Sequence, residues 1–216
     1  MALTLWIGNK KYSSWSLRPW IALKVAGIPF EEVLVPLRTD EFKSRVREVS
    51  PAGRVPVLRD GDAVVWESLA ILEHLAERFP DARLWPAEPN ARAHARSIAA
   101  EMHGGFGALR SHCPMNMARQ RPRALTPEVE ADVRRIDAMW SDARARFGKG
   151  GPFLFGAFSA ADAMYAPVVS RFVSYEIGVS RAARDYMAAV TALPAYAEWK
   201  AAGLAEPWVL AGNDPD

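Results

Sequence analysis

The chain has 216 residues, half of them apolar, which is enough for one large or two small domains with a packed core. Its 27 basic and 25 acidic residues leave a net charge of +2 and are scattered, which argues against a dedicated nucleic-acid surface. The single cysteine, Cys113, excludes an internal disulfide, and no set of zinc ligands can be assembled, so we expect no metal site.

The amino-terminal stretch offers no targeting or membrane signal. Leu3-Thr4-Leu5 runs quickly into polar residues, so the apolar core of a signal peptide is lacking. No run approaches the roughly 18 apolar residues that a membrane span needs. We therefore expect a soluble cytoplasmic protein without a membrane partner.

The first eighty residues alternate between strand and helix patterns. Residues 3–8 favour a strand, residues 16–26 a helix with Pro19 in its first turn, and residues 30–35 a second strand. The usual right-handed crossover would make the two strands parallel. Residues 39–49 form a short charged stretch, helical or irregular.

The stretch 48–68 contains the clearest local pattern of the chain, which predicts a β-hairpin. Pro56 cannot donate to a ladder, so it marks the beginning of a strand at 57–58. Asp60-Gly61 is a strong turn signal, and residues 63–66 form the returning strand.

Glu67 and Ser68 follow this hairpin and open a helix over 69–77. Serine is a good helix cap, and the free N–H groups of a helix start attract a carboxylate. A proline-bent backbone edge, a carboxylate and an anion-binding helix start could thus lie together. The alternative is a hairpin followed by a capped helix and nothing more.

Beyond Phe79 the composition changes, and nearly everything is helical. We predict a first domain over 1–80, a proline-rich linker over 81–89 and an all-helical domain over 90–216. Ser159 and Asp162 match a capping box. The predicted helices of the second domain are 90–110, 127–147, 160–175, 181–193 and 195–202.

Four of these stretches resemble one family, the cytosolic glutathione transferases. Residues 53–58 are similar to its cis-proline segment and residues 66–71 to its Glu/Gln-Ser motif. Residues 12–18 resemble the serine loop of its zeta class, which includes maleylacetoacetate isomerases, and residues 158–162 resemble the helix cap of its second domain. The resemblance implies an α/β thioredoxin-like N-terminal domain followed by an all-α C-terminal domain.

The same resemblance implies that glutathione is the co-substrate. Val55 would offer its backbone N–H and C=O to the cysteinyl part of glutathione, before a cis Pro56. The Glu67 carboxylate would bind the α-ammonium group, and Ser68 the α-carboxylate.

The chemistry needs a thiolate, whereas a free thiol with a pKa of about 8.5 is only a few per cent ionised at neutral pH. A hydroxyl at a helix start can favour the charged form, and Ser13 and Ser14 are the candidates. Ser13 aligns with the first serine of the family motif, Ser16 is a further alternative, and Ser14 or Ser16 could instead only cap the helix. Trp15 replaces the cysteine of the motif, which argues against disulfide reductase chemistry and puts specific maleylacetoacetate isomerase activity in doubt.

Further candidates lie in the second domain. His103 and Phe106 flank a glycine-rich patch that, with Trp15 and Arg110, could line an electrophile pocket, although close helix packing explains the patch equally well. Arg171 could meet a substrate carboxylate. Glu101 could reach a partner's glutathione across a dimer interface or be a solvated carboxylate. The loop with Arg119, Arg121 and Arg123 is expected to be solvated.

These observations predict a glutathione-dependent transferase or isomerase that forms a homodimer and adds the thiolate to a small electrophile. The alternative is a glutathione-binding or protein-interaction module with the same fold and little turnover.

Overall fold

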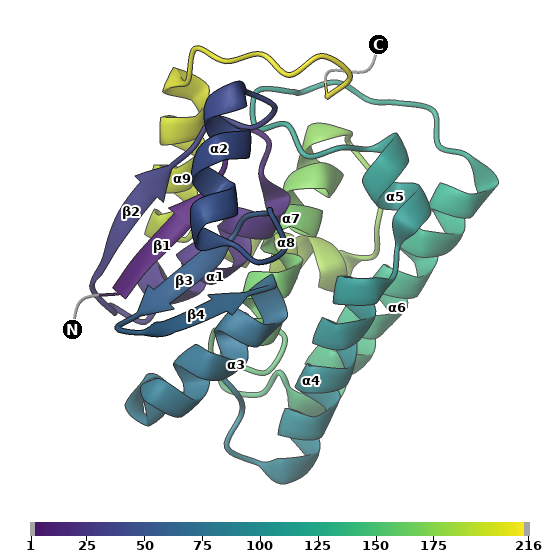
Figure 1. Ribbon diagram of the computed structural model, residues 1–216. Coiled ribbons are helices and arrows are strands. Elements are labelled where there is room, and N and C mark those ends of the chain that lie inside the picture. The colour runs from purple at the N-terminus through teal and green to yellow at the C-terminus, as the bar shows by residue number, and fades with distance from the viewer. Residues whose placement is uncertain (1–2, 214–216) are drawn as a thin grey trace.

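The computed structural model describes residues 3–213, so the ends of the predicted domains 1–80 and 90–216 lie outside the described residues. Its sheet has four strands, β1 (Leu3–Ile7), β2 (Phe30–Leu34), β3 (Val57–Asp60) and β4 (Ala63–Trp66), in the order β2-β1-β3-β4 (Figure 1). The strands β1 and β2 are parallel, as predicted, and β3 and β4 form an antiparallel hairpin. Its turn contains Gly61 at φ 61°, a conformation that favours glycine.

Helices cover both faces of this sheet. The side chains of Leu3, Leu5 and Ile7 alternate toward one face and join the core with α1 (Ser14–Val25) and α3 (Ser68–Arg78). On the other face, Arg45 of α2 (Asp40–Val49) lies over the Trp6 ring, 5.3 Å from its centre. The layers are therefore α2, sheet, and α1 with α3.

The rest of the chain is helical after a 3-10 turn, η1 (Pro80–Ala82). The helix α7 is buried along almost its whole length, and it packs against both α1 and α4, so the two parts of the chain share one core. The helices are α4 (Pro89–Gly104), α5 (Gly107–His112), α6 (Pro127–Phe147), α7 (Ala160–Ser174), α8 (Arg181–Thr191) and α9 (Pro194–Ala205).

The predicted helix over 90–110 is wrong, because the glycine patch interrupts it. Gly105 is extended, with φ −103° and ψ −168°, and a Cβ there would lie 2.6 Å from the Glu101 carbonyl oxygen. Phe106 follows in the left-handed region at φ 56° and begins α5. The patch therefore turns the chain, and Arg110 lies on a separate short helix.

Two helix starts also differ from the prediction. Helix α1 begins at Ser14 with Ser13 as its N-cap, so Pro19 lies inside the helix rather than in its first turn. Glu67 is the N-cap of α3, and Ser68 is its first helical residue rather than its cap. Both shifts affect the site described below.

The predicted capping box at the start of α7 is confirmed. The Asp162 carboxylate accepts hydrogen bonds from the backbone N–H groups of Ser159 and Leu154, at 2.8 and 3.1 Å, and from the Ser159 hydroxyl. Burial raises the pKa of Asp162 to about 6. Between residues 3 and 213, no helix has the length and apolar character for crossing a membrane, and no cluster of residues could hold a metal.

Candidate active site

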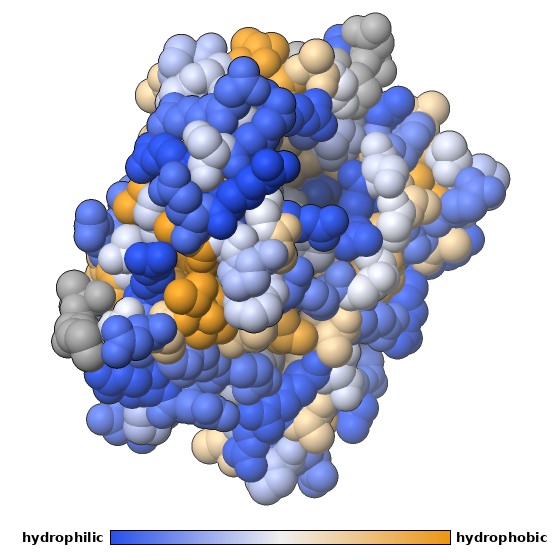
Figure 2. Space-filling model, in the orientation of Figure 1, coloured by the Kyte–Doolittle hydropathy of each residue, from blue (hydrophilic) through white to orange (hydrophobic). Residues whose placement is uncertain are grey.

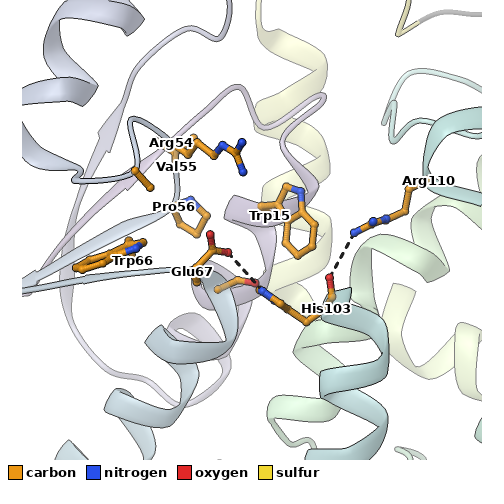
Figure 3. A pocket seen from close by; sticks show the side chains of 10 residues that line it. Trp15, Arg54, Val55, Pro56, Trp66, Glu67, His103 and Arg110 are labelled. Atoms are coloured by element: carbon orange, nitrogen blue, oxygen red, sulfur yellow. Dashed lines mark hydrogen bonds and ion pairs between the residues drawn. The ribbon is translucent and has the colours of Figure 1, made fainter. Parts of the chain in front are cut away.

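A cavity of about 330 Å³ lies between the sheet and the helices α4 and α5. The space-filling view is hollowed in this region, and hydrophilic side chains border the hollow (Figure 2). We call this cavity the first pocket. Its lining residues are Trp15, Ala52, Arg54, Val55, Pro56, Trp66, Glu67, Ser68, His103 and Arg110 (Figure 3).

The hairpin and the start of α3 form one wall of the first pocket. The Val55–Pro56 bond is cis, as the sequence resemblance implied. Glu67 has φ 66° and ψ 125°, and its side chain does not cap α3, so the carboxylate faces the pocket with half its surface exposed. The Ser68 hydroxyl is buried, 3.8 Å from the Met164 sulfur. Because no side chain caps α3, its first N–H groups remain available to an anion.

His103, at the end of α4, forms the opposite wall. Its Nε2 lies 3.5 Å from a carboxylate oxygen of Glu67, and its ring meets the Trp15 ring edge-on with a centre distance of 5.3 Å (Figure 3). Burial lowers the pKa of His103, and Arg18 and Arg110 lower it further, whereas Glu67 opposes this change. His103 is thus largely neutral at pH 7. It therefore forms no ion pair with the Glu67 carboxylate, which can bind another cation.

The two candidate serines of the serine loop, Ser13 and Ser14, have different surroundings. The Ser13 hydroxyl donates to the Ser16 hydroxyl oxygen at 2.8 Å, and that oxygen accepts the Gly8 N–H at 3.1 Å. Ser13 lines neither pocket described here. Ser14, the first residue of α1, lines a second cavity of about 330 Å³. Of the two predicted serines, only Ser14 therefore lines a pocket described here.

This second cavity, the second pocket, adjoins the first, because Trp15 and Arg110 line both. Two guanidinium groups lie over the Trp15 ring, with the Arg18 carbon 3.9 Å and the Arg110 carbon 5.4 Å from its centre. Such stacking holds the indole in place as a partition. The second pocket is lined by Tyr12, Ser14, Trp15, Arg110, Pro114, Met115, Arg171 and Asn213.

Three arginines concentrate positive charge around this partition. Arg18 is fully buried and donates through Nε to the Met164 carbonyl at 3.0 Å. Arg171 donates to the carbonyls of Cys113 and Pro167 at 2.9 and 3.1 Å. Within residues 3–213, no carboxylate pairs with Arg18, Arg110 or Arg171.

The accumulated positive charge contributes to lowered pKa values of the two buried arginines, Arg18 and Arg171. Burial and, after it, the charge of Arg110 lower the pKa of Arg171 to about 10. The pKa of Arg18 is also lowered by burial and by both other arginines. A pocket with several cations and no nearby counter-charge favours an anionic ligand.

Some predicted site residues lie elsewhere. Phe106 is buried in the core and lines neither pocket. The Glu101 carboxylate accepts two hydrogen bonds from Arg135 of the same chain, at 2.7 and 2.8 Å, which lowers its pKa. Arg119 is buried against the Tyr175 ring instead of being solvated.

The sequence analysis missed several lining residues. Trp66 lines the first pocket, and 40 % of its surface is exposed. Arg18 lines neither pocket but stacks on the Trp15 ring, and it follows Ser14 by one helical turn, a spacing that could have placed it beside the serine loop. No sequence signal indicates Asn213, which reaches the second pocket from far along the chain.

Family models match two segments of the chain. Residues 12–78 match the model described as glutathione S-transferase, N-terminal domain, and residues 126–202 match glutathione S-transferase, C-terminal domain. Together the matches cover most of the chain.

Curated relatives match over shorter stretches. A probable maleylacetoacetate isomerase of Caenorhabditis elegans is 41% identical over 97 residues, covering 45% of each chain. A zeta-class glutathione S-transferase of Euphorbia esula is 38% identical over 124 residues, covering 56% of this chain and 55% of that protein. The chain thus spans about half the length of the curated relatives it matches.

Solved structures align over nearly the whole chain. The holo structure of a bacterial zeta-class maleylpyruvate isomerase has a TM-score of 0.70 and 25% identity, covering 94% of this chain and 98% of that one. The fold described above is therefore that of the glutathione transferases.

Proposed function

The chain belongs to the glutathione S-transferase family, and from this membership we propose that it is an enzyme that binds glutathione and adds the glutathione thiolate to a small electrophile. The observation that carries the proposal is the junction of the two pockets. The glutathione-binding elements of the family pattern line the first pocket, and a hydroxyl at a helix start lines the adjoining second pocket.

The first pocket fits glutathione by the chemistry of its walls. Val55 precedes the cis peptide bond and would present its backbone to the cysteinyl part. Glu67 would bind the α-ammonium group, and Ser68 with the uncapped N–H groups of α3 would bind the α-carboxylate. The neutral state of His103 supports this assignment, since it leaves the Glu67 carboxylate without a competing cation.

We assign thiol activation to Ser14 rather than Ser13. Ser14 begins a 12-residue helix and faces the second pocket, whereas Ser13 gives its proton to Ser16. Lowering the thiol pKa by about two units requires roughly 2.7 kcal/mol. A charge-assisted hydrogen bond contributes about 1.5–3 kcal/mol and a helix start about 0.3–1 kcal/mol, so the two together suffice.

The second pocket would hold the electrophile, and its arginines favour one that carries a carboxylate. Arg110 and Arg171 both line this pocket, and neither pairs with a carboxylate of the described chain. In conjugation, the thiolate electron pair forms a carbon–sulfur bond while a leaving group departs with its bonding pair. In isomerisation, addition to a cis double bond conjugated to a carbonyl yields an enolate, the remaining single bond rotates, and the thiolate is expelled.

Turnover of two probes tests the proposal. Chlorodinitrobenzene reports conjugation, and maleylacetone, a cis keto acid, reports isomerisation. We expect turnover of at least one of them, a loss of about tenfold or more in Ser14→Ala, and little change in the affinity for S-methylglutathione, which has no ionisable thiol. Glutathione binding without turnover of any electrophile would leave the binding-module alternative standing.

We also propose that the protein forms a homodimer. The edge strand β4 and the start of α3 carry a largely apolar groove lined by Val64, Val65, Trp66, Glu67 and Ala70, and a second copy would cover it. Sedimentation of the wild type and of Trp66→Glu tests this assembly, because the added charge should leave only monomers.

A further inference from the structure

The residues that immediately precede the serine loop are held by the carboxy-terminal part of the chain. Lys10 and Lys11 together have two backbone N–H and two backbone C=O groups. Each of these four groups forms a hydrogen bond with a residue more than one hundred positions away in the sequence. Glu206 accepts the N–H of Lys10 at 2.6 Å and the N–H of Lys11 at 3.0 Å. The Lys10 carbonyl accepts Trp199 Nε1–H at 2.8 Å.

The fourth group, the Lys11 carbonyl, accepts the N–H of Met117 at 3.1 Å. The Lys11 ammonium group donates back to the carbonyl oxygens of Glu206 and Trp208, at 2.9 and 3.4 Å. Gly203 of α9 packs so closely that a Cβ there would lie 2.9 Å from the Lys11 nitrogen. The junction is therefore tight as well as fully hydrogen-bonded.

The segment that follows Glu206 continues from this junction to the second pocket. In Figure 1 it runs from α9 across the top of the molecule toward the loop between α5 and α6. Arg38 donates to the Ala211 carbonyl at 2.7 Å, and Asn116 donates to the Asn213 carbonyl at 3.3 Å. Asn213 then lines the second pocket beside Tyr12 and Ser14.

We propose that Glu206 is a positioning residue for thiol activation: its carboxylate fixes the Lys10–Lys11 backbone and thereby holds Ser14 at the second pocket. The inference rests on the proposed function, in which the Ser14 hydroxyl donates a hydrogen bond to the glutathione thiolate. Only two residues separate Lys11 from Ser14, so a displacement of this backbone passes directly into the start of α1. A misplacement of about 1 Å at a reacting group can lower the rate roughly 100-fold.

The carboxylate is suited to this role because both of its oxygens are used. The Lys10 and Lys11 N–H groups need two acceptors side by side, which an amide at position 206 cannot supply. Glu206→Gln would keep one acceptor and direct an NH₂ group at the second N–H. Glu206→Ala would remove both acceptors and leave two partly buried donors without partners.

Steady-state turnover of chlorodinitrobenzene and the affinity for S-methylglutathione would be measured for the wild type, Glu206→Ala and Glu206→Gln. Glu198→Gln is the matched control, because Glu198 lies on α9, the helix that Glu206 follows, but pairs with Lys24 at 2.8 Å, away from the serine loop. We expect kcat to fall roughly 10- to 100-fold in Glu206→Ala and less in Glu206→Gln. The Kd of S-methylglutathione, which has no ionisable thiol, should stay within about twofold in all variants, because the first pocket lies apart from Glu206.

The pKa of the bound glutathione thiol separates positioning from mere stabilisation. It should rise in both Glu206 variants and remain at the wild-type value in Glu198→Gln. A lower melting temperature with unchanged kcat and thiol pKa would overturn the inference and leave the proposed function intact. A wild type that neither turns over the probe nor lowers the thiol pKa would overturn the proposed function and the inference together.

Discussion

Acidification should weaken the binding of glutathione in the first pocket, because it protonates His103. The groups that face this imidazole are Glu67 on α3, Arg18 on α1, Arg110 on α5 and the Trp15 ring. Burial and the two arginines place its pKa below the ordinary 6.5, so the imidazole is neutral at pH 7. When the pH falls through that pKa, His103 gains a proton and competes for Glu67 with the ammonium group of glutathione.

The distance sets the size of this effect. Two unit charges separated by the 3.5 Å between His103 Nε2 and Glu67 Oε2 interact by about 1.2 kcal/mol in water and about 5 kcal/mol at an effective dielectric constant of 20. Both side chains are partly exposed, at 29% and 49%, so the lower end applies. We therefore expect glutathione affinity to fall by about tenfold between pH 7 and the acid side of the His103 titration.

The assay should use S-methylglutathione, which has no ionisable thiol and thus removes the thiol from the pH profile. Binding is followed by the fluorescence of Trp15 and Trp66, which line the pocket, over about pH 5 to pH 7. In His103→Gln the affinity should be nearly constant over this range. His112→Gln, a histidine that bonds the Ala124 carbonyl, is the control. An unchanged pH profile in His103→Gln would refute the competition.

Three further substitutions test other parts of the account. Asp162→Ala should lower the free energy of unfolding by roughly 2–5 kcal/mol, because the Leu154 and Ser159 N–H groups lose their buried acceptor; urea unfolding measures this, and a change under about 0.5 kcal/mol would contradict it. Arg110→Met should raise KM about tenfold for maleylacetone but not for uncharged chlorodinitrobenzene, and an equal rise for both would contradict an anion-binding role. Gly203→Ala should lower both melting temperature and kcat, since its Cβ would meet the Lys10–Lys11 backbone, and wild-type values of both would contradict the close packing.

Local patterns predicted the hairpin and its surroundings because their signals are local. Pro56 lacks an N–H, and the Asp60-Gly61 turn suits a residue with positive φ, so strand and turn follow from a few neighbouring residues. The helical pattern of residues 127–147 likewise predicted α6, and the spacing of Ser159 and Asp162 predicted the capping box of α7. The family resemblance then placed Val55, Glu67 and Ser68 together, and the three do line one pocket.

The sequence could not show which way individual side chains turn. The identity of the hydroxyl that faces the second pocket depends on where α1 begins, and a shift of two residues makes Ser13 the N-cap and directs its proton to Ser16. The break at Gly105 lies in the backbone conformation of two residues, extended at Gly105 and left-handed at Phe106, between two segments that both have a helical pattern. Glu206 and Asn213 reach the site only through contacts across nearly the whole chain, which no local pattern records.

The ionisation of bound glutathione tests the central claim most directly. Thiolate absorbance at about 240 nm would be followed as a function of pH for the wild type, Ser14→Ala and Ser13→Ala. The account predicts a thiol pKa well below 8.5 in the wild type and a return toward 8.5 in Ser14→Ala, with a smaller rise in Ser13→Ala. Glutathione that binds the wild type with an unshifted thiol pKa would contradict thiol activation by this protein.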